Sequence, residues 1–334
     1  MEFKHTMAAH CESGTVAALL NHAGLAITEP MVFGISSGIF FGYFSKQPSL
    51  NFPTFIVRNK PGQMRKNISQ RLGISFYTEK FSDPVKAEKT LDTLLEKGIP
   101  VGIQVDFFYM NYLPPWMRVH INMHYITVVG KKNNLYIVSD CYHPQLAEID
   151  AETLRKARFP GGMMSPQGFL FYPLRIPPAE KINLKQAIAK GIHKSAFNMV
   201  KLPIPFLGIN GIRKFSKKLP EWPSLARDTE HLSHEIMKIN VLLEDQGTGG
   251  AGFRFMFATF LRQASEIMQD ERLLALSKKM MEIGDGWREI SLFAARIGKN
   301  RDLGTDKIKQ LSEMIWGRSV VEKEFFTELY KLKF

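Results

Sequence analysis

Residues 124–140 have the sequence HYITVVGKKNNLYIVSD, the clearest local fold signal in the chain. Two runs rich in β-branched and aromatic residues, 124–130 and 135–140, flank the polar, turn-prone tetrapeptide at 131–134. This pattern predicts an antiparallel β-hairpin. One strand begins at His124 and the other ends at Asp140, so the fold-back at the turn brings these two side chains toward each other.

Helices and strands alternate around this hairpin in the first 175 or so residues. The small and Leu-rich residues after Cys11 predict a helix that ends near Gly24, and Thr28-Glu29-Pro30 predicts the start of another. A further helix begins at Asp83-Pro84. The predicted strands are 38–44, 54–58, 74–78, 100–105 and 168–174.

From Lys181 onward the pattern is helical. The predicted helices are 184–200, 225–244, 253–268, 271–296 and 306–332. A proline-containing stretch at 175–180 separates the two patterns. We therefore predict an α+β chain with a catalytic domain at residues 1–177 and an all-α helical domain at residues 178–334.

The bulk composition sets the broad class of protein. The chain has 334 residues, of which 45% are hydrophobic, so it can bury a large core. It has two cysteines, Cys11 and Cys141, too few for a disulfide framework. The sequence has no internal repeat, no apolar run of membrane-spanning length and no signal-peptide pattern before Cys11. These observations predict a cytoplasmic location.

Three residues have the chemistry of a cysteine-dependent enzyme. Thiol catalysis needs a thiolate, a base and a group that orients the base. Cys11 lies at a predicted helix N-terminus, where the helix dipole favours the thiolate and amide groups favour an oxyanion. His124 and Asp140 supply the base and its orienting group, in the papain-type chain order. Taken singly, each residue also has a purely structural interpretation: a small buried cysteine, a strand histidine and a turn-capping aspartate.

The sequence also resembles a known family. The motifs are His10-Cys11-Glu12 with the residues up to Gly38, then Val105–Pro114, then His124–Gly130 followed by Asp140. Together they resemble the N-terminal region of the butirosin biosynthesis protein H family over most of residues 5–175. The strand histidine before Val-Val-Gly is also similar to that of bacteriocin-processing cysteine peptidases. Residues 247–254 resemble the helical domain of unknown function that accompanies this N-terminal region.

This resemblance implies a papain-like acyltransferase. In the family, an acyl group passes from an acyl carrier protein to an amine. Cys11 would attack the thioester of the carrier's phosphopantetheine arm, His124 would then deprotonate a small amine acceptor, and Asp140 would hold the imidazole. No bound cofactor is expected; the phosphopantetheine-linked acyl donor is a substrate.

Other residues are candidates for substrate contacts. Asp106, Tyr109 and Tyr112 follow a predicted strand and are candidates to line an acceptor pocket, since an acid there can bind an amine. The alternative is a loop acid with aromatic core packing. Glu29 has the simpler interpretation of a carboxylate at a helix N-terminus.

Metal and nucleotide sites are not predicted. Zinc-ligand residue types occur, but their spacing matches no compact zinc motif: His120, His124, Asp140, Cys141 and His143. The stretch 247–252 has the spacing G-x-G-x-x-G, but a helical pattern precedes it, whereas a dinucleotide fingerprint needs a strand. A tight helix–helix connection is the better interpretation. A phosphate contact is one interpretation of Arg254, which follows it.

The net charge of +12 is concentrated in one segment. Residues 181–218 contain nine Lys or Arg and no acidic residue. Because carrier proteins are typically acidic, we predict a docking face for one here. The predicted docking residues are Arg213, Lys214, Lys217 and Lys218. A solvated face and peripheral contact with an anionic membrane are the alternatives. Nucleic acid is not expected, because no binding motif accompanies the charge.

Several functions stay open at this level. The leading interpretation is the acyltransferase, and the same residues suit a cysteine amide or thioester hydrolase or a peptidase-like enzyme. Cleavage before Cys11 would instead give an N-terminal-nucleophile hydrolase. A carrier- or lipid-binding protein that keeps the fold without catalysis is the non-enzymatic alternative. The acyl group, the acceptor and the oligomeric state do not follow from the sequence.

Overall fold

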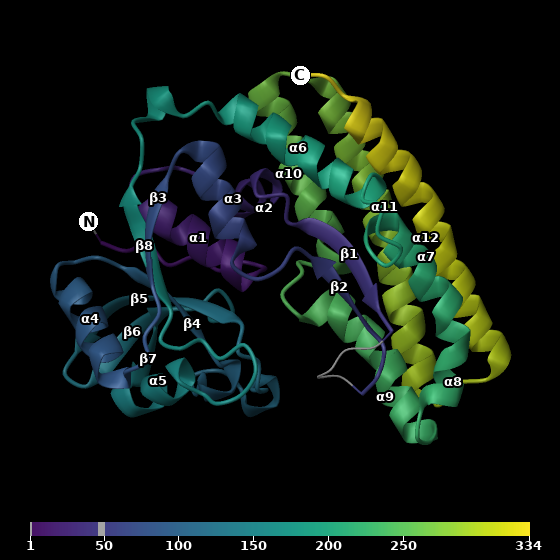
Figure 1. The fold of residues 1–334 in the computed structure, drawn as a ribbon, viewed down its shortest axis with the longest axis horizontal. Coiled ribbons are helices and arrows are strands. Elements are labelled where there is room, and N and C mark those ends of the chain that lie inside the picture. Colours follow the sequence, from purple (N-terminus) through teal and green to yellow (C-terminus); the bar gives the residue numbers. More distant parts are fainter. Residues whose placement is uncertain (1, 46–50) are drawn as a thin grey trace. The chain divides into compact units, whose positions relative to one another are not determined.

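The computed structural model describes residues 2–45 and 51–334, and the chain forms two compact units (Figure 1). The first unit consists of Met1–Val32 and Pro61–Asn183, and the second of Phe33–Lys60 and Leu184–Phe334. The predicted fold class, a mixed α and β domain followed by a helical region, is confirmed. The predicted boundary at 177/178 misplaces one segment, because residues 33–60 belong with the helices.

A six-stranded sheet is the centre of the first unit, with strand order β3-β8-β4-β5-β6-β7. Every neighbouring pair is antiparallel. The predicted hairpin is β5 and β6, in which Lys132 pairs with Leu135 across the turn. The strands are β3 (Ser75–Glu79), β4 (Val101–Val105), β5 (His124–Lys132), β6 (Leu135–Ser139), β7 (Ala147–Asp150) and β8 (Leu170–Arg175).

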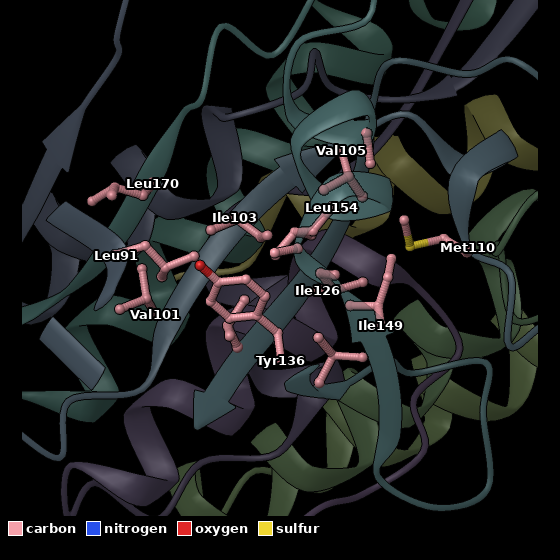
Figure 2. Packing of buried hydrophobic residues seen from close by; sticks show 14 of the residues in the cluster. Leu91, Val101, Ile103, Val105, Met110, Ile126, Tyr136, Ile149, Leu154 and Leu170 are labelled. Atoms are coloured by element: carbon pink, nitrogen blue, oxygen red, sulfur yellow. The ribbon is translucent and has the colours of Figure 1, made fainter. Parts of the chain in front are cut away.

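Helices cover both faces of this sheet. Leu91 of α4 (Pro84–Glu96) and Leu154 of α5 (Ala151–Arg158) pack in one apolar cluster with Val101 and Ile103 of β4 (Figure 2). Alternate strand residues point to opposite faces. Accordingly, a Cβ at Gly102 would lie 3.0 Å from Leu19 of α1 (Cys11–His22). Helix α1, which carries the candidate nucleophile, therefore covers the face opposite α4 and α5.

The shorter elements of the first unit connect these layers. They are α2 (Glu29–Ile35), which crosses into the second unit, α3 (Gln63–Leu72), and the 3-10 turns η1 (Phe107–Tyr109), η2 (Pro115–Met117) and η3 (Ala179–Lys181). The sequence did not predict α3, α5 or β7. Each is short, and only three residues of α3 are buried, so the periodic apolar signal is weak.

The second unit is a set of long helices with a two-stranded hairpin. The helices are α6 (Leu184–Val200), α7 (Gly208–Lys218), α8 (Trp222–Leu225), α9 (Thr229–Asn240), α10 (Arg254–Met268), α11 (Glu271–Lys299) and α12 (Thr305–Lys331). The turns are η4 (Leu219–Glu221), the π-helical η5 (Val241–Asp245) and η6 (Ala251–Phe253). The predicted 225–244 helix begins later, at Thr229, and α7 was not predicted.

Aromatic packing explains why the hairpin β1 (Ile39–Phe44) and β2 (Thr54–Arg58) belongs to the helical unit. Phe41 stacks on Phe55 of β2, on Phe215 of α7 and on Trp287 of α11, with ring centroids 5.5–6.3 Å apart. Tyr43 also stacks on Phe215, at 5.4 Å. Aromatic pairs at such separations add stability beyond the area they bury. Nothing in the local pattern of residues 39–58 specifies these distant partners.

None of the helices in the described ranges is long and apolar enough to cross a bilayer.

A buried ion pair lies among the long helices. The guanidinium of Arg254 donates from Nε and Nη2 to the two carboxylate oxygens of Glu322, at 2.9 and 3.1 Å, and from Nη1 to the Gly252 carbonyl. The indole of Trp287 also donates to Glu322. Both charged side chains are fully buried. The suggested phosphate contact of Arg254 is therefore wrong, because its guanidinium is fully buried and already pairs with the Glu322 carboxylate.

We expect Glu322→Gln to destabilise the chain strongly. The substitution leaves the Arg254 charge buried without a counter-charge, a change that typically costs about 3–5 kcal/mol. Urea unfolding followed by tryptophan fluorescence measures the loss. The matched control is Glu266→Gln, which breaks the exposed Arg262–Glu266 pair and should cost less than about 1 kcal/mol. Equal losses in the two variants would contradict the prediction.

Candidate active site

Cys11 is the first residue of α1, and the chain before it is tightly held. His10 is the N-cap, with extended backbone, and its Nδ1 accepts a hydrogen bond from the Ser13 amide. The amides at a helix N-terminus have no acceptor within the helix and favour negative charge. The thiol of Cys11 is 8% exposed and lies 3.9 Å from the Met123 carbonyl oxygen.

The carboxylate of Glu29 anchors this start of α1. It accepts hydrogen bonds from the Ala9 and His10 amides, at 2.9 and 2.8 Å, and from the Ser13 hydroxyl at 3.0 Å. Burial raises the pKa of Glu29, and the three hydrogen bonds oppose that rise only in part. Glu29 is thus more than a helix-dipole residue, since it fixes the backbone on the N-terminal side of Cys11.

His124 and Asp140 meet as the hairpin predicts. Thr127 of β5 pairs with Ser139 of β6, so Asp140 lies diagonally across the hairpin from His124, within reach of a long side chain. His124 Nε2 lies 2.8 Å from Asp140 Oδ2. His124 is 4% exposed and Asp140 is fully buried.

Asp140 is held as a carboxylate by several donors. Its Oδ1 accepts the Tyr142 amide at 3.0 Å, and its Oδ2 accepts the Tyr112 hydroxyl at 2.9 Å in addition to His124. Burial alone would raise the pKa of Asp140, but the charge of His124 and these hydrogen bonds hold it below its ordinary value. Asp140 therefore stays ionised although no part of it reaches solvent.

The imidazole of His124 responds to this charge. Burial alone would lower the pKa of His124, but the charge and hydrogen bond of Asp140, together with the Cys11 thiol, raise it to about 10. One of these causes is a hydrogen bond with the Cys11 side chain, so the thiol lies beside the imidazole ring. Since Nε2 faces Asp140, Nδ1 is the nitrogen left to exchange a proton with the thiol. Phe107 and Tyr142 pack against the ring and fix its plane.

Two family models match this chain. Residues 10–141 match the family model described as butirosin biosynthesis protein H, N-terminal. Residues 152–329, more than half of the chain, match the model described as a domain of unknown function, DUF4872. The chain belongs to the DUF4872 family. The resemblance to butirosin biosynthesis protein H is confirmed over the residues that carry Cys11, His124 and Asp140.

Among solved structures, this DUF4872 protein is similar to a C39-like peptidase from Bacillus anthracis. The two share 12% identity with a TM-score of 0.37, over 53% of this chain and 96% of the other. Comparison with curated proteins finds no match. Within the residues that match butirosin biosynthesis protein H, a thiol at a helix N-terminus beside a buried imidazole–carboxylate pair has the geometry of a cysteine-dependent enzyme.

The predicted substrate-binding residues have other partners. Asp106 is 1% exposed; its Oδ1 accepts the Phe108 and Ile121 amides and its Oδ2 lies 2.7 Å from His120 Nδ1. The loop-acid interpretation therefore describes Asp106 better than an amine contact. Tyr112 donates to Oδ2 of Asp140, the same oxygen that His124 contacts, and no sequence pattern predicted this role. Tyr109 packs against Phe108 and His120.

The other cysteine differs from Cys11 in its surroundings. Burial raises the pKa of the Cys141 thiol, and the neighbouring charge of Asp140 raises it further. Cys141 also lies beyond the end of a strand and not at a helix N-terminus. No group of three or more potential ligands suited to a metal ion occurs in the described parts of the chain.

The predicted docking residues of the DUF4872 domain lie on and at the end of α7. Arg213 and Lys217 lie over the ring of Trp316, at 5.6 and 5.5 Å from its centroid, and Lys214 lies over Phe206. Trp316 is 38% exposed. Lys218 instead pairs with Glu221 at 2.7 Å. Two of the four cations thus border the exposed ring of Trp316, the third lies over the half-buried ring of Phe206, and the fourth pairs with a carboxylate.

We expect the contribution of His124 to stability to depend on pH. Its folded-state pKa of about 10 lies above the ordinary value of 6.5, so the contribution is complete below about pH 6.5 and is lost as the pH rises through about 10. His124→Gln should therefore destabilise the chain more at about pH 6 than above about pH 10. Urea unfolding at several pH values measures this difference. His234→Gln, at an exposed position of α9, is the control, and a pH-independent difference for His124→Gln would contradict the prediction.

Proposed function

We propose that this protein is an acyltransferase that carries an acyl group on Cys11 from a carrier-protein thioester to an amine. The observation that carries the proposal is the buried His124–Asp140 pair beside a thiol at a helix N-terminus. With its raised pKa, His124 keeps a proton at neutral pH and can stabilise the Cys11 thiolate as its partner. This arrangement suits attack on a carbonyl.

The acylation step follows from this arrangement. The Cys11 thiolate attacks the thioester carbonyl, and amides at the start of α1 stabilise the developing oxyanion. The C–S bond to the donor breaks, and the departing thiolate takes the proton from His124. Cys11 is then acylated and His124 is neutral, held in place by Asp140.

Two observations favour transfer to an amine over hydrolysis. Cys11, His124 and Asp140 are 8%, 4% and 0% exposed, which limits the access of bulk water to the acyl-enzyme. The resemblance to butirosin biosynthesis protein H, which implies acyl transfer to an amine, points the same way. The alternative N-terminal-nucleophile enzyme is less well supported, because Ala8, Ala9 and His10 all form backbone hydrogen bonds that hold the segment before Cys11 in place.

Intact-protein mass spectrometry after incubation with acyl-pantetheine thioesters tests the nucleophile. Wild type should gain the mass of one acyl group, and Cys11→Ser should lose this gain entirely. Cys141→Ser is the matched control and should keep it, since burial disfavours the Cys141 thiolate. An adduct on Cys11→Ser would contradict the assignment. Release of free acid by wild type without an amine product would indicate the hydrolase instead.

An acidic carrier protein is the proposed donor, docking on the α7 cations beside Trp316 and Phe206. We expect Arg213→Glu, Lys214→Glu and Lys217→Glu together to raise the KM for an acyl-carrier protein at least roughly tenfold. The long-range attraction and the direct contacts with an acidic carrier would both become repulsive. The effect should shrink at high salt. The control reverses Lys80, Lys89 and Lys97, which are exposed lysines of the first unit. An unchanged KM for the carrier, or an equal rise with acyl-pantetheine, would contradict docking at this face.

A further inference from the structure

A second imidazole–carboxylate pair lies on the loop between β4 and β5. His120 Nδ1 is 2.7 Å from Asp106 Oδ2. The carboxylate is buried, with 2% of its side chain exposed, whereas the imidazole is 64% exposed. The pair thus has a buried orienting group and a solvent-facing ring, and the acylation step described above does not use it.

The ring of His120 is fixed although it faces solvent. It stacks on Phe108 with ring centroids 4.0 Å apart and an interplanar angle of 20°, and Tyr109 packs edge-on against it. Asp106 is itself held by the Phe108 and Ile121 amides. In the neutral imidazole, Nδ1–H then donates to Asp106 and Nε2 keeps a free lone pair. This is the tautomer that a base requires.

The loop also limits how far His120 can lie from the thiol. His120 precedes Met123 by three residues, and the Met123 carbonyl oxygen lies 3.9 Å from Cys11 Sγ. Three residues span at most about 11 Å even when fully extended, and the chain turns at residues 122–123. Asn122 additionally ties this part of the loop to residues 161–163 through two carbonyl oxygens. The chain therefore keeps His120 within about 11 Å of the residue whose carbonyl contacts the thiol, a separation that an acceptor amine bound at acyl-Cys11 can span.

Transfer of the acyl group to a primary amine requires the removal of two protons from that amine. A primary amine carries an extra proton at neutral pH. It must lose one proton before it can attack acyl-Cys11 and a second as the C–N bond forms and the C–S bond breaks. His124, neutral after acylation, can take one of these protons and so restores the imidazolium beside the Cys11 thiolate. The other proton needs a second acceptor.

We propose that His120 is this second base. Resting on the acyltransferase function, the inference assigns Nε2 of His120 to take a proton from the ammonium group of the acceptor and to release it to solvent. The free amine then attacks acyl-Cys11, and His124 takes the second proton as the amide forms. Asp106 is the positioning residue that keeps the lone pair of His120 directed outward.

Two kinds of nucleophile, hydroxylamine and primary amines, distinguish a role of His120 as a base from a purely structural role. The acyl-enzyme is formed with acyl-pantetheine and then mixed with hydroxylamine, which is largely unprotonated at neutral pH, or with primary amines (propylamine, ethanolamine and spermidine). In His120→Gln and His120→Ala, transfer to the primary amines should fall on the order of a hundredfold, the size of a general-base contribution. Acylation of Cys11 and transfer to hydroxylamine should stay within about twofold of wild type, because neither needs the second base. His234→Gln is the control histidine.

The outcomes distinguish failure of this inference from failure of the proposed acyltransferase function on which it rests. Absence of any acyl adduct on wild type would overturn the proposed function and the inference with it. Normal acylation with unchanged transfer to the amines in both His120 variants would overturn the inference alone. An equal loss of transfer to hydroxylamine and to the amines would also overturn the inference, because it would mean that His120 only shapes the loop. Failure of wild type to use any primary amine would overturn it too.

Discussion

The hydrogen bond between His124 and Asp140 is the interaction on which the rest of the site depends. A fully buried carboxylate is unstable as an anion unless donors surround it. Here the donors come from three places in the chain: the ring of His124, the amide of Tyr142 and the hydroxyl of Tyr112. The hairpin register, the turn after β6 and the β4–β5 loop must all be correct before Asp140 can be ionised. The charge that results is what keeps a proton on His124.

A second buried carboxylate performs the corresponding task for the nucleophile. Glu29 accepts two amides and a hydroxyl from residues 9–13 and so fixes the entry into α1. The Ala9 and His10 amides are thereby directed to Glu29, which sets where the first turn of α1 begins. One acidic side chain thus positions the thiol and the other the imidazole, and neither needs to touch substrate.

Local patterns were sufficient for the elements that carry the site, and insufficient for partners far apart in the sequence. The hairpin, the helix after Cys11 and most long helices follow from residue alternation, turn residues and apolar periodicity, and the hairpin alone implied the meeting of His124 and Asp140. The aromatic contacts of Phe41, the ion pair of Arg254 and Glu322, and the hydroxyl of Tyr112 on Asp140 join segments 28 to 246 residues apart. No pattern within one segment specifies such pairs. This is why residues 33–60 and the roles of Asp106 and Tyr112 were assigned differently from sequence.

The β4–β5 connection joins these observations. It begins at Asp106, which pairs with His120, and leads to His124, which pairs with Asp140. Tyr112, in the middle of the connection, donates a hydrogen bond to Asp140. The thiol, by contrast, is fixed by α1 and Glu29, which belong to other segments. In the proposed reaction, one part of the chain therefore holds the nucleophile, and another holds both bases, His124 and His120. If the protein is the proposed transferase, we expect changes in the exposed residues of this loop, Phe108, Trp116 and Val119 among them, to alter the choice of amine while the geometry of thiol attack stays intact, as is general for loops on a rigid scaffold.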